Sequence, residues 1–177
     1  MNDHAAPAPP EGRAALLTQL IQHLSCGDLD AHEVEAIVGV CLEAGANPSE
    51  VLAEHYGADA AQVARYDPQG VTAFVIFIEL EDYFAISDTV DELHEQIMAA
   101  FETPMLPDFP YENDFETLGD YFAWLDGQLN IHHPRYQLIQ FGQSYTHDFQ
   151  VILVYRADVE RVLELCQQLG VEADFCG

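Results

Sequence analysis

The most unusual property of this sequence is its lack of positive charge. It contains no lysine and five arginines against 31 aspartates and glutamates, so its formal net charge is −26. A chain of this charge repels nucleic-acid phosphates and anionic membrane surfaces, which excludes both as binding partners. A basic protein, a cation or a salty medium is compatible with it. An acidity that serves only to keep the protein in solution is equally compatible.

Cysteines are few, and none is spaced like a metal ligand or a redox motif. The four thiols belong to Cys26, Cys41, Cys166 and Cys176, and no pair has C-x-x-C spacing. Cys41 and Cys166 fall on apolar helical faces, which predicts small core residues rather than nucleophiles. The N-terminus lacks a leader pattern, and no apolar run approaches the ~20 residues that span a bilayer. These absences predict a reduced, cytoplasmic protein that does not enter a membrane.

Signatures of catalysis are also missing. The sequence has no phosphate-binding glycine loop, no dinucleotide fingerprint, no G-x-S-x-G turn and no H-E-x-x-H helix. His132 and His133 precede a predicted strand, whereas His147 follows the same strand beside Tyr145 and Asp148. The two groups lie at opposite ends of that strand, so we expect exposed turn residues rather than a catalytic pair. The sequence predicts no catalytic residue, cofactor or metal site and favours a protein that is not an enzyme.

The most apolar stretch of the chain covers residues 71–80 and is rich in β-branched and aromatic side chains. It follows a turn signal, Asp-Pro-Gln-Gly, at residues 67–70. A short apolar run that is bounded by a turn is typical of a strand buried on both faces. We therefore predict that residues 71–80 form a central strand, around which the rest of the chain is organised.

The chain before this stretch predicts a flexible tail over residues 1–10 and a helical cap over residues 11–66. Apolar residues recur every three or four positions, and Asn47 followed by Pro48 is a strong helix start. Short helices joined by turns suggest a helix-turn-helix DNA reader. Residues 14–64, however, contain no arginine or lysine that could contact phosphates. We expect a helical cap that packs on the sheet instead.

The chain from residue 71 onward predicts an α+β domain over residues 71–177. The elements that follow the first strand are helices near 88–101 and 114–129, strands at 135–141 and 149–155, a helix from 158 to 169 and a strand at 171–175. With one helix set aside, this is the βαββαβ order of ferredoxin-like folds, in which the first and third strands are central. We predict an antiparallel sheet of about four strands in that order, with helices on one face. The path of the two-helix crossover, residues 81–134, stays open.

Three patterns in this domain resemble a bacterial family of small acidic proteins of unknown function. They are Phe77-Ile78-Glu79 before an acidic helix, Leu125 and Leu129 before Tyr136-x-Leu138, and an apolar run at 149–154 before the last helix. The resemblance covers residues 71–177. It implies no activity, cofactor or catalytic residue.

The clearest candidate site is a block of carboxylates. Between Tyr66 and Pro134 there are 15 acidic residues and no arginine or lysine. Calcium or magnesium accepts oxygen ligands of this kind, but the spaced ligands of an EF-hand loop are absent. The predicted binding surface consists of Glu79, Glu81, Asp82, Asp88, Asp91, Glu92 and Glu95.

These observations favour a protein-interaction module of the immunity or inhibitor type that binds a basic partner. One alternative is a structural domain whose acidity is compositional. Another is a small enzyme or metal-binding domain that uses the carboxylates between Glu79 and Glu95. The sequence leaves the oligomeric state open, because an exposed strand at 171–175 could pair two copies into a homodimer.

Overall fold

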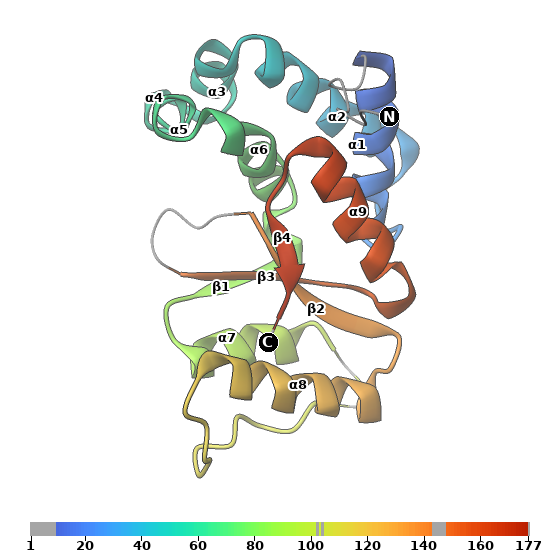
Figure 1. Cartoon of the computed structure of the whole chain (residues 1–177), viewed down its shortest axis with the longest axis vertical. Coiled ribbons are helices and arrows are strands. Elements are labelled where there is room, and N and C mark those ends of the chain that lie inside the picture. The colour runs from blue at the N-terminus through green and yellow to red at the C-terminus, as the bar shows by residue number, and fades with distance from the viewer. Residues whose placement is uncertain (1–9, 102, 104, 143–147, 177) are drawn as a thin grey trace, which may run out of the picture.

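The structure is a computed structural model of the chain that describes residues 10–101, 103, 105–142 and 148–176 (Figure 1). The α-helices are α1 (Pro10–Leu24), α2 (Ala31–Ala46), α3 (Pro48–Tyr56), α4 (Ala58–Ala61), α5 (Val63–Tyr66), α6 (Val71–Glu79), α7 (Val90–Ala99), α8 (Leu118–His132) and α9 (Val159–Leu169). Three short 3-10 helices are η1 (Pro68–Gly70), η2 (Glu81–Tyr83) and η3 (Arg156–Asp158). None of the helices within these ranges has the length and apolar composition that crossing a bilayer requires.

Four antiparallel strands form the sheet, in the order β1-β3-β2-β4. They are β1 (Phe84–Ser87), β2 (Tyr136–Phe141), β3 (Phe149–Tyr155) and β4 (Ala173–Phe175). The class and the number of strands agree with the prediction. The ferredoxin-like order is not found, because the second and third strands are central here and the last strand pairs with the second.

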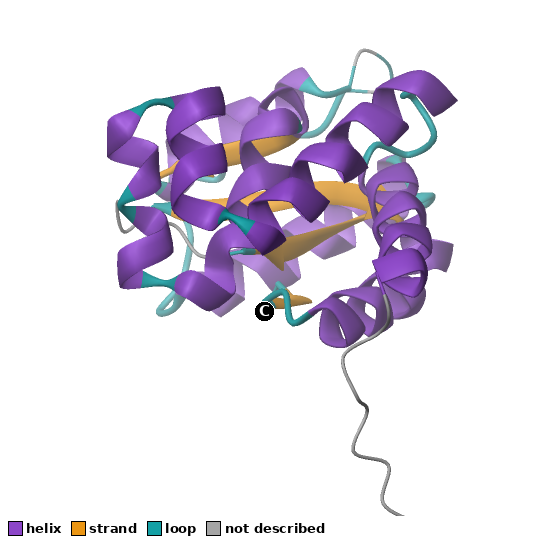
Figure 2. Ribbon diagram, turned by 90° about the horizontal axis from the view of Figure 1, so that it is seen from above, coloured by secondary structure: helices purple, strands orange, loops and turns teal. Residues whose placement is uncertain are grey.

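Helices cover both faces of the sheet, and not one face as predicted (Figure 1). α1 to α6 and α9 form the upper layer, so the predicted cap of residues 11–66 is part of a larger layer. Viewed from above, this helical layer lies over the strands (Figure 2). α7 and α8 form the lower layer, and each layer has its own core. Leu17, Ile76 and Leu165 are fully buried in the upper core, and Leu93 and Leu129 in the lower core.

The stretch predicted as the central strand, residues 71–80, is instead helix α6 and its C-cap Leu80. α6 packs between helices of the upper layer and the sheet, where the ring centroids of Phe77 and Phe84 lie 5.0 Å apart. It is therefore apolar on nearly every side and shows no amphipathic period that would distinguish it from a buried strand. Its start is encoded by Asp67, whose carboxylate accepts a hydrogen bond from the Gly70 N–H at 3.1 Å, and by Pro68 at the first position of η1. The first strand comes later, at Phe84–Ser87, and lies at the sheet edge.

The crossover from β1 to β2 contains both α7 and α8. Figure 1 shows the two helices side by side beneath the sheet, with the proline-rich segment between them running back underneath α8. Because this segment brings the chain back to the end of the sheet where α7 begins, the two helices can connect β1 to β2, which run in the same direction. Two predicted segments fall partly outside the described residues: the tail up to residue 9, and the turn with Tyr145 and His147. Pro10, the last residue of the predicted tail, already belongs to α1.

Candidate functional site

The seven predicted carboxylates fall into two groups at opposite ends of strand β1. The first group precedes the strand: Glu79 ends α6, and Glu81 and Asp82 lie on η2. Glu79 accepts a hydrogen bond from the Tyr56 hydroxyl, with 2.6 Å between the oxygens. Burial and this bond raise the pKa of Tyr56, so the phenol remains a donor. Glu79 is thus tied to α3, away from the second group.

The second group follows β1 and belongs to the lower layer. Asp88 comes directly after the strand, Asp91 and Glu92 lie in the first turn of α7, and Glu95 is one turn further along. Four strand residues span roughly 13 Å at ~3.3 Å per residue, so the two groups flank the strand rather than form one cluster. The carboxylates in the first turn of α7 are stabilised by the positive end of the helix dipole.

The segment between α7 and α8 adds more acidic residues to the lower layer. Asp120 accepts hydrogen bonds from the backbone N–H groups of Glu116 and Thr117 at 2.8 and 3.1 Å, and these bonds lower its pKa. The carboxylate is therefore firmly ionised. We call the described acidic residues from Asp88 to Asp120 the lower acidic surface: Asp88, Asp91, Glu92, Glu95, Asp108, Glu112, Asp114, Glu116 and Asp120. All of them are exposed except Asp91, which is half-buried.

The buried residue His94 connects the segments that carry the lower acidic surface. No pattern in the sequence predicted this role. His94 is fully buried on the inner side of α7. Its Nε2 lies 2.8 Å from the carbonyl oxygen of Pro107, and its Nδ1 lies 2.9 Å from the Tyr121 hydroxyl. The rings of Phe109 and Trp124 pack around the imidazole at centroid distances of 6.0 and 5.4 Å. One side chain thus joins α7, the proline-rich segment and α8.

The structure offers little nucleophilic or metal-binding chemistry. Burial raises the pKa of Cys41, Cys166 and Cys176 to about 12, so these thiols are protonated at neutral pH. Cys41 and Cys166 lie in the core, as the helical periodicity predicts. Within the described ranges, no three His, Cys, Asp or Glu side chains converge on a point that could hold a metal ion.

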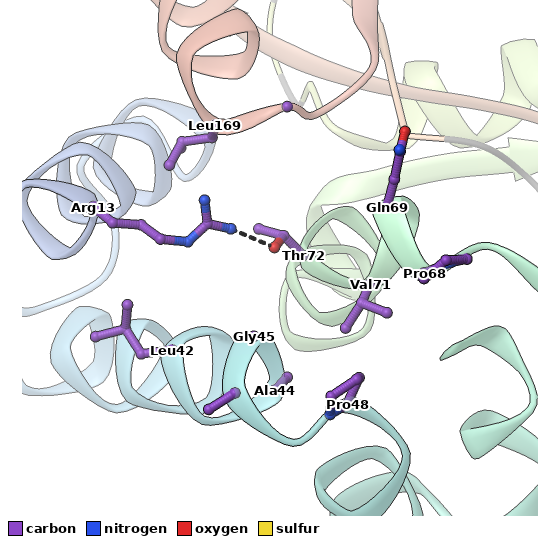
Figure 3. Close-up of a pocket in the computed structure, with 12 residues that line it drawn as sticks. Arg13, Leu42, Ala44, Gly45, Pro48, Pro68, Gln69, Val71, Thr72 and Leu169 are labelled. Atoms are coloured by element: carbon purple, nitrogen blue, oxygen red, sulfur yellow. Dashed lines mark hydrogen bonds between the residues drawn. The ribbon is translucent and has the colours of Figure 1, made fainter. Parts of the chain in front are cut away.

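A separate hollow of about 640 Å³ lies in the upper layer, where several helices meet end to end (Figure 3). Its walls come from the C-terminal ends of α2 and α9, the start of α3, η1 and the first turn of α6. The lining residues are Arg13, Leu42, Ala44, Gly45, Ala46, Pro48, Pro68, Gln69, Val71, Thr72, Leu169 and Gly170. The hollow is therefore largely apolar, and none of these residues is acidic.

Arg13 extends across the hollow from α1 towards α6 (Figure 3). Its Nη2 donates a hydrogen bond to the Thr72 hydroxyl at 2.8 Å, and Leu42 and Leu169 lie on either side. Thr72 is buried, whereas Arg13 is half-buried. The sequence held one clue to this position: Arg13 precedes Leu17 by four residues and Leu20 by seven, so it lies on the apolar face of α1.

Comparison with known proteins gives no match: no protein-family model, no curated protein and no solved structure is similar to this chain. The resemblance to a family of small acidic bacterial proteins therefore stays a prediction.

Proposed function

We propose that this protein is an interaction module of the immunity or inhibitor type, located in the cytoplasm, that binds a basic protein through the lower acidic surface. The observation that carries the proposal is the collection of nine carboxylates on one helical layer, within a stretch of sequence that contains no arginine or lysine. A surface of one sign attracts an oppositely charged partner and accelerates its association.

The backbone beneath these carboxylates is well supported, which favours specific binding over diffuse attraction. His94 fixes the proline-rich segment against α7, and Thr117 begins α8 with a capping box that includes Asp120. Asn113 adds local bonds, because its side chain donates to the Pro110 carbonyl and accepts from the Phe115 N–H at 2.6 and 2.9 Å. A surface that is ordered before binding loses less conformational entropy when a partner docks.

In the described parts of the chain, none of the nine carboxylates of the lower acidic surface forms a salt bridge. Among the described residues, the ion pair that reaches α8 joins Arg156 to Asp126 at 2.8 Å, in the middle of that helix. The first turns of α7 and α8 and the segment between them rely on helix dipoles and backbone N–H groups instead. Their mutual repulsion would fall when a cationic surface covers them, which provides a driving force for binding.

The test compares two variants that lose the same number of charges. One neutralises the α7 carboxylates, and the other neutralises exposed carboxylates of the upper layer. The substitutions are Asp88→Asn, Asp91→Asn, Glu92→Gln and Glu95→Gln in the first, and Glu35→Gln, Glu50→Gln, Glu54→Gln and Asp59→Asn in the control. Immobilised wild type and both variants would capture proteins from a native extract at low salt, and association rates would then be measured with the captured partner.

We expect the wild type and the control variant to retain one basic protein, and the α7 variant to lose it. Its association rate should fall at least tenfold in the α7 variant at low salt, and this difference should shrink in high salt. Equal losses in both variants would indicate attraction by total charge alone. That result, together with stability that rises steadily with salt, would favour the alternative of compositional acidity.

A further inference from the structure

The hollow around Arg13 has an electrostatic character opposite to that of the rest of the chain. Among its twelve lining residues, Arg13 carries the one formal charge, and the walls are mostly aliphatic. The volume of about 640 Å³ lies within the usual range of small-molecule sites, roughly 300–1,000 Å³. In a protein with 31 acidic residues, an acid-free hollow with a central cation requires an explanation.

Arg13 has unused hydrogen-bonding capacity. A guanidinium carries five N–H donors, and in the described part of the chain the Arg13 side chain has one partner, the neutral Thr72 hydroxyl. Other arginines find negative or π partners: Arg156 pairs with Asp126, Arg161 with Glu164 at 3.2 Å, and Arg135 lies 5.2 Å from the Tyr155 ring centroid. A half-buried guanidinium that has no carboxylate partner among the described residues is well suited to accept an anion from solution.

The surroundings indicate how much negative charge the site can take. Arg13 is the single cation among the described lining residues, which include no lysine, histidine or second arginine. The carboxyl ends of α2 and α9 also face it, at Ala44–Ala46 and at Leu169, and a helix C-terminus disfavours anions. The start of α3, at Pro48, and the first turn of α6, with Val71 and Thr72, contribute favourable dipoles. This balance suits one negative charge and opposes a phosphate dianion.

We propose that the hollow binds a small monocarboxylate with a short aliphatic body. The planar fork of the Arg13 guanidinium would receive the two carboxylate oxygens in a bidentate pair, the geometry for which arginine is better suited than lysine. The Thr72 hydroxyl keeps the guanidinium oriented towards the hollow. The aliphatic body would displace water from the walls formed by Leu42, Val71 and Leu169.

The proposal is tested by titrating the full-length protein with octanoate, by calorimetry and by amide chemical shifts. Octanamide keeps the body without the charge, acetate keeps the charge without the body, and inorganic phosphate supplies the dianion. We expect saturable octanoate binding, with each of the other three at least tenfold weaker. The amides of Thr72, Gly45 and Gly170 should shift with octanoate. Equal binding of octanamide, or tighter binding of phosphate, would overturn the proposal.

Two matched variants separate the site from total charge. Arg13→Gln should weaken octanoate binding at least tenfold. Arg65→Gln, which removes an exposed arginine from α5, should leave it unchanged. Equal affinities in the two variants would contradict the proposal. If Arg13→Gln does not fold, the wild-type shifts decide: octanoate shifts confined to residues outside the hollow, or no saturation in the millimolar range, reject the site.

Discussion

The Tyr121 hydroxyl donates a hydrogen bond to Nδ1 of His94 across 2.9 Å in the interior of the lower layer. The direction of this bond follows from the other ring nitrogen: Nε2 faces the Pro107 carbonyl, which can only accept, and so carries the proton. Both imidazole nitrogens thus have a hydrogen-bond partner. The pair fixes α7, α8 and the segment between them in one arrangement.

Replacing His94 should destabilise the protein markedly. His94→Phe keeps an aromatic ring but leaves the Pro107 carbonyl and the Tyr121 hydroxyl without their buried partner, which we expect to cost about 2–3 kcal/mol. Tyr121→Phe removes one of the two bonds and should cost about 1–2 kcal/mol. Urea unfolding measures both. Glu95→Gln, on the exposed side of α7, is the control and should change stability by less than about 0.5 kcal/mol. A His94→Phe variant as stable as this control would refute the assigned role.

Arg156 should not be replaceable by lysine. Its guanidinium donates to Asp126 at 2.8 Å, to the Tyr136 carbonyl at 3.0 Å, and to the Gln137 amide oxygen and the Pro134 carbonyl at 3.3 Å each. A lysine ammonium cannot reach these acceptors together, so Arg156→Lys should lose about 1–2 kcal/mol of unfolding free energy. Arg65→Lys, at an exposed position, should be neutral. Equal stabilities of the two variants would show that the bonds around Arg156 contribute little.

The cysteines should react slowly in the folded protein. At pH 8 a thiol of pKa about 12 is ionised in roughly one molecule in ten thousand, and Cys41 and Cys166 are also shielded from reagents. Cys26 is half-buried and burial raises its pKa as well, but it is more accessible than these two. Cys176 is also half-buried, so titration with a chromogenic disulfide should give a slow reaction of Cys26 and Cys176, of which Cys26→Ser removes one equivalent. In urea all four thiols should react at once, and rapid native labelling of Cys41 would contradict the structure.

The stability of the fold should fall in strong alkali because of Tyr83. The Tyr83 hydroxyl donates to Asp28, and this bond raises its pKa from 10.0 to about 12. Since the folded state holds the phenol proton more tightly, this contribution is complete below pH 10 and is lost as the pH rises to about 12. Asp28→Asn should lower the pKa of Tyr83. Absorbance at 295 nm during alkaline titration would detect the change, and an unaltered curve in the variant would count against the pairing.

The fold was predictable where local signals agree with the tertiary environment. β3 and α9 lie within a residue of their expected positions, because a continuous apolar run marks one and an amphipathic stripe before Gly170 marks the other. The prediction of a strand at residues 71–80 was wrong because here the local signal is ambiguous. A helix buried between other helices and a sheet requires the same side chains as a strand buried on both faces, so composition could not separate them. The true first strand, four residues at an edge, gives too short a pattern to detect.

The candidate sites were predictable to different degrees. A run of acidic residues without arginine or lysine is visible in the sequence itself, so the acidic residues of α7 were identifiable without coordinates. Their separation from Glu79, Glu81 and Asp82 was not, because it depends on β1 passing between the two layers. The Arg13 hollow joins residues from four separate stretches of the chain, and no local pattern encodes such a meeting. His94 was equally hidden, since its partners lie 13 and 27 positions away.

The packing of α1 against α9 sets the order in which the chain can mature during synthesis. Arg161 of α9 donates to Gln19 of α1 at 2.8 Å across 142 sequence positions, and Leu17 and Leu165 share the upper core. The apolar face of the first helix therefore emerges from the ribosome long before its partner exists. The lower layer, by contrast, draws on residues that lie closer together in the sequence. A nascent chain paused before residue 159 would leave the part of α1 that packs on α9 uncovered, so it would be prone to aggregate until the last helix is made.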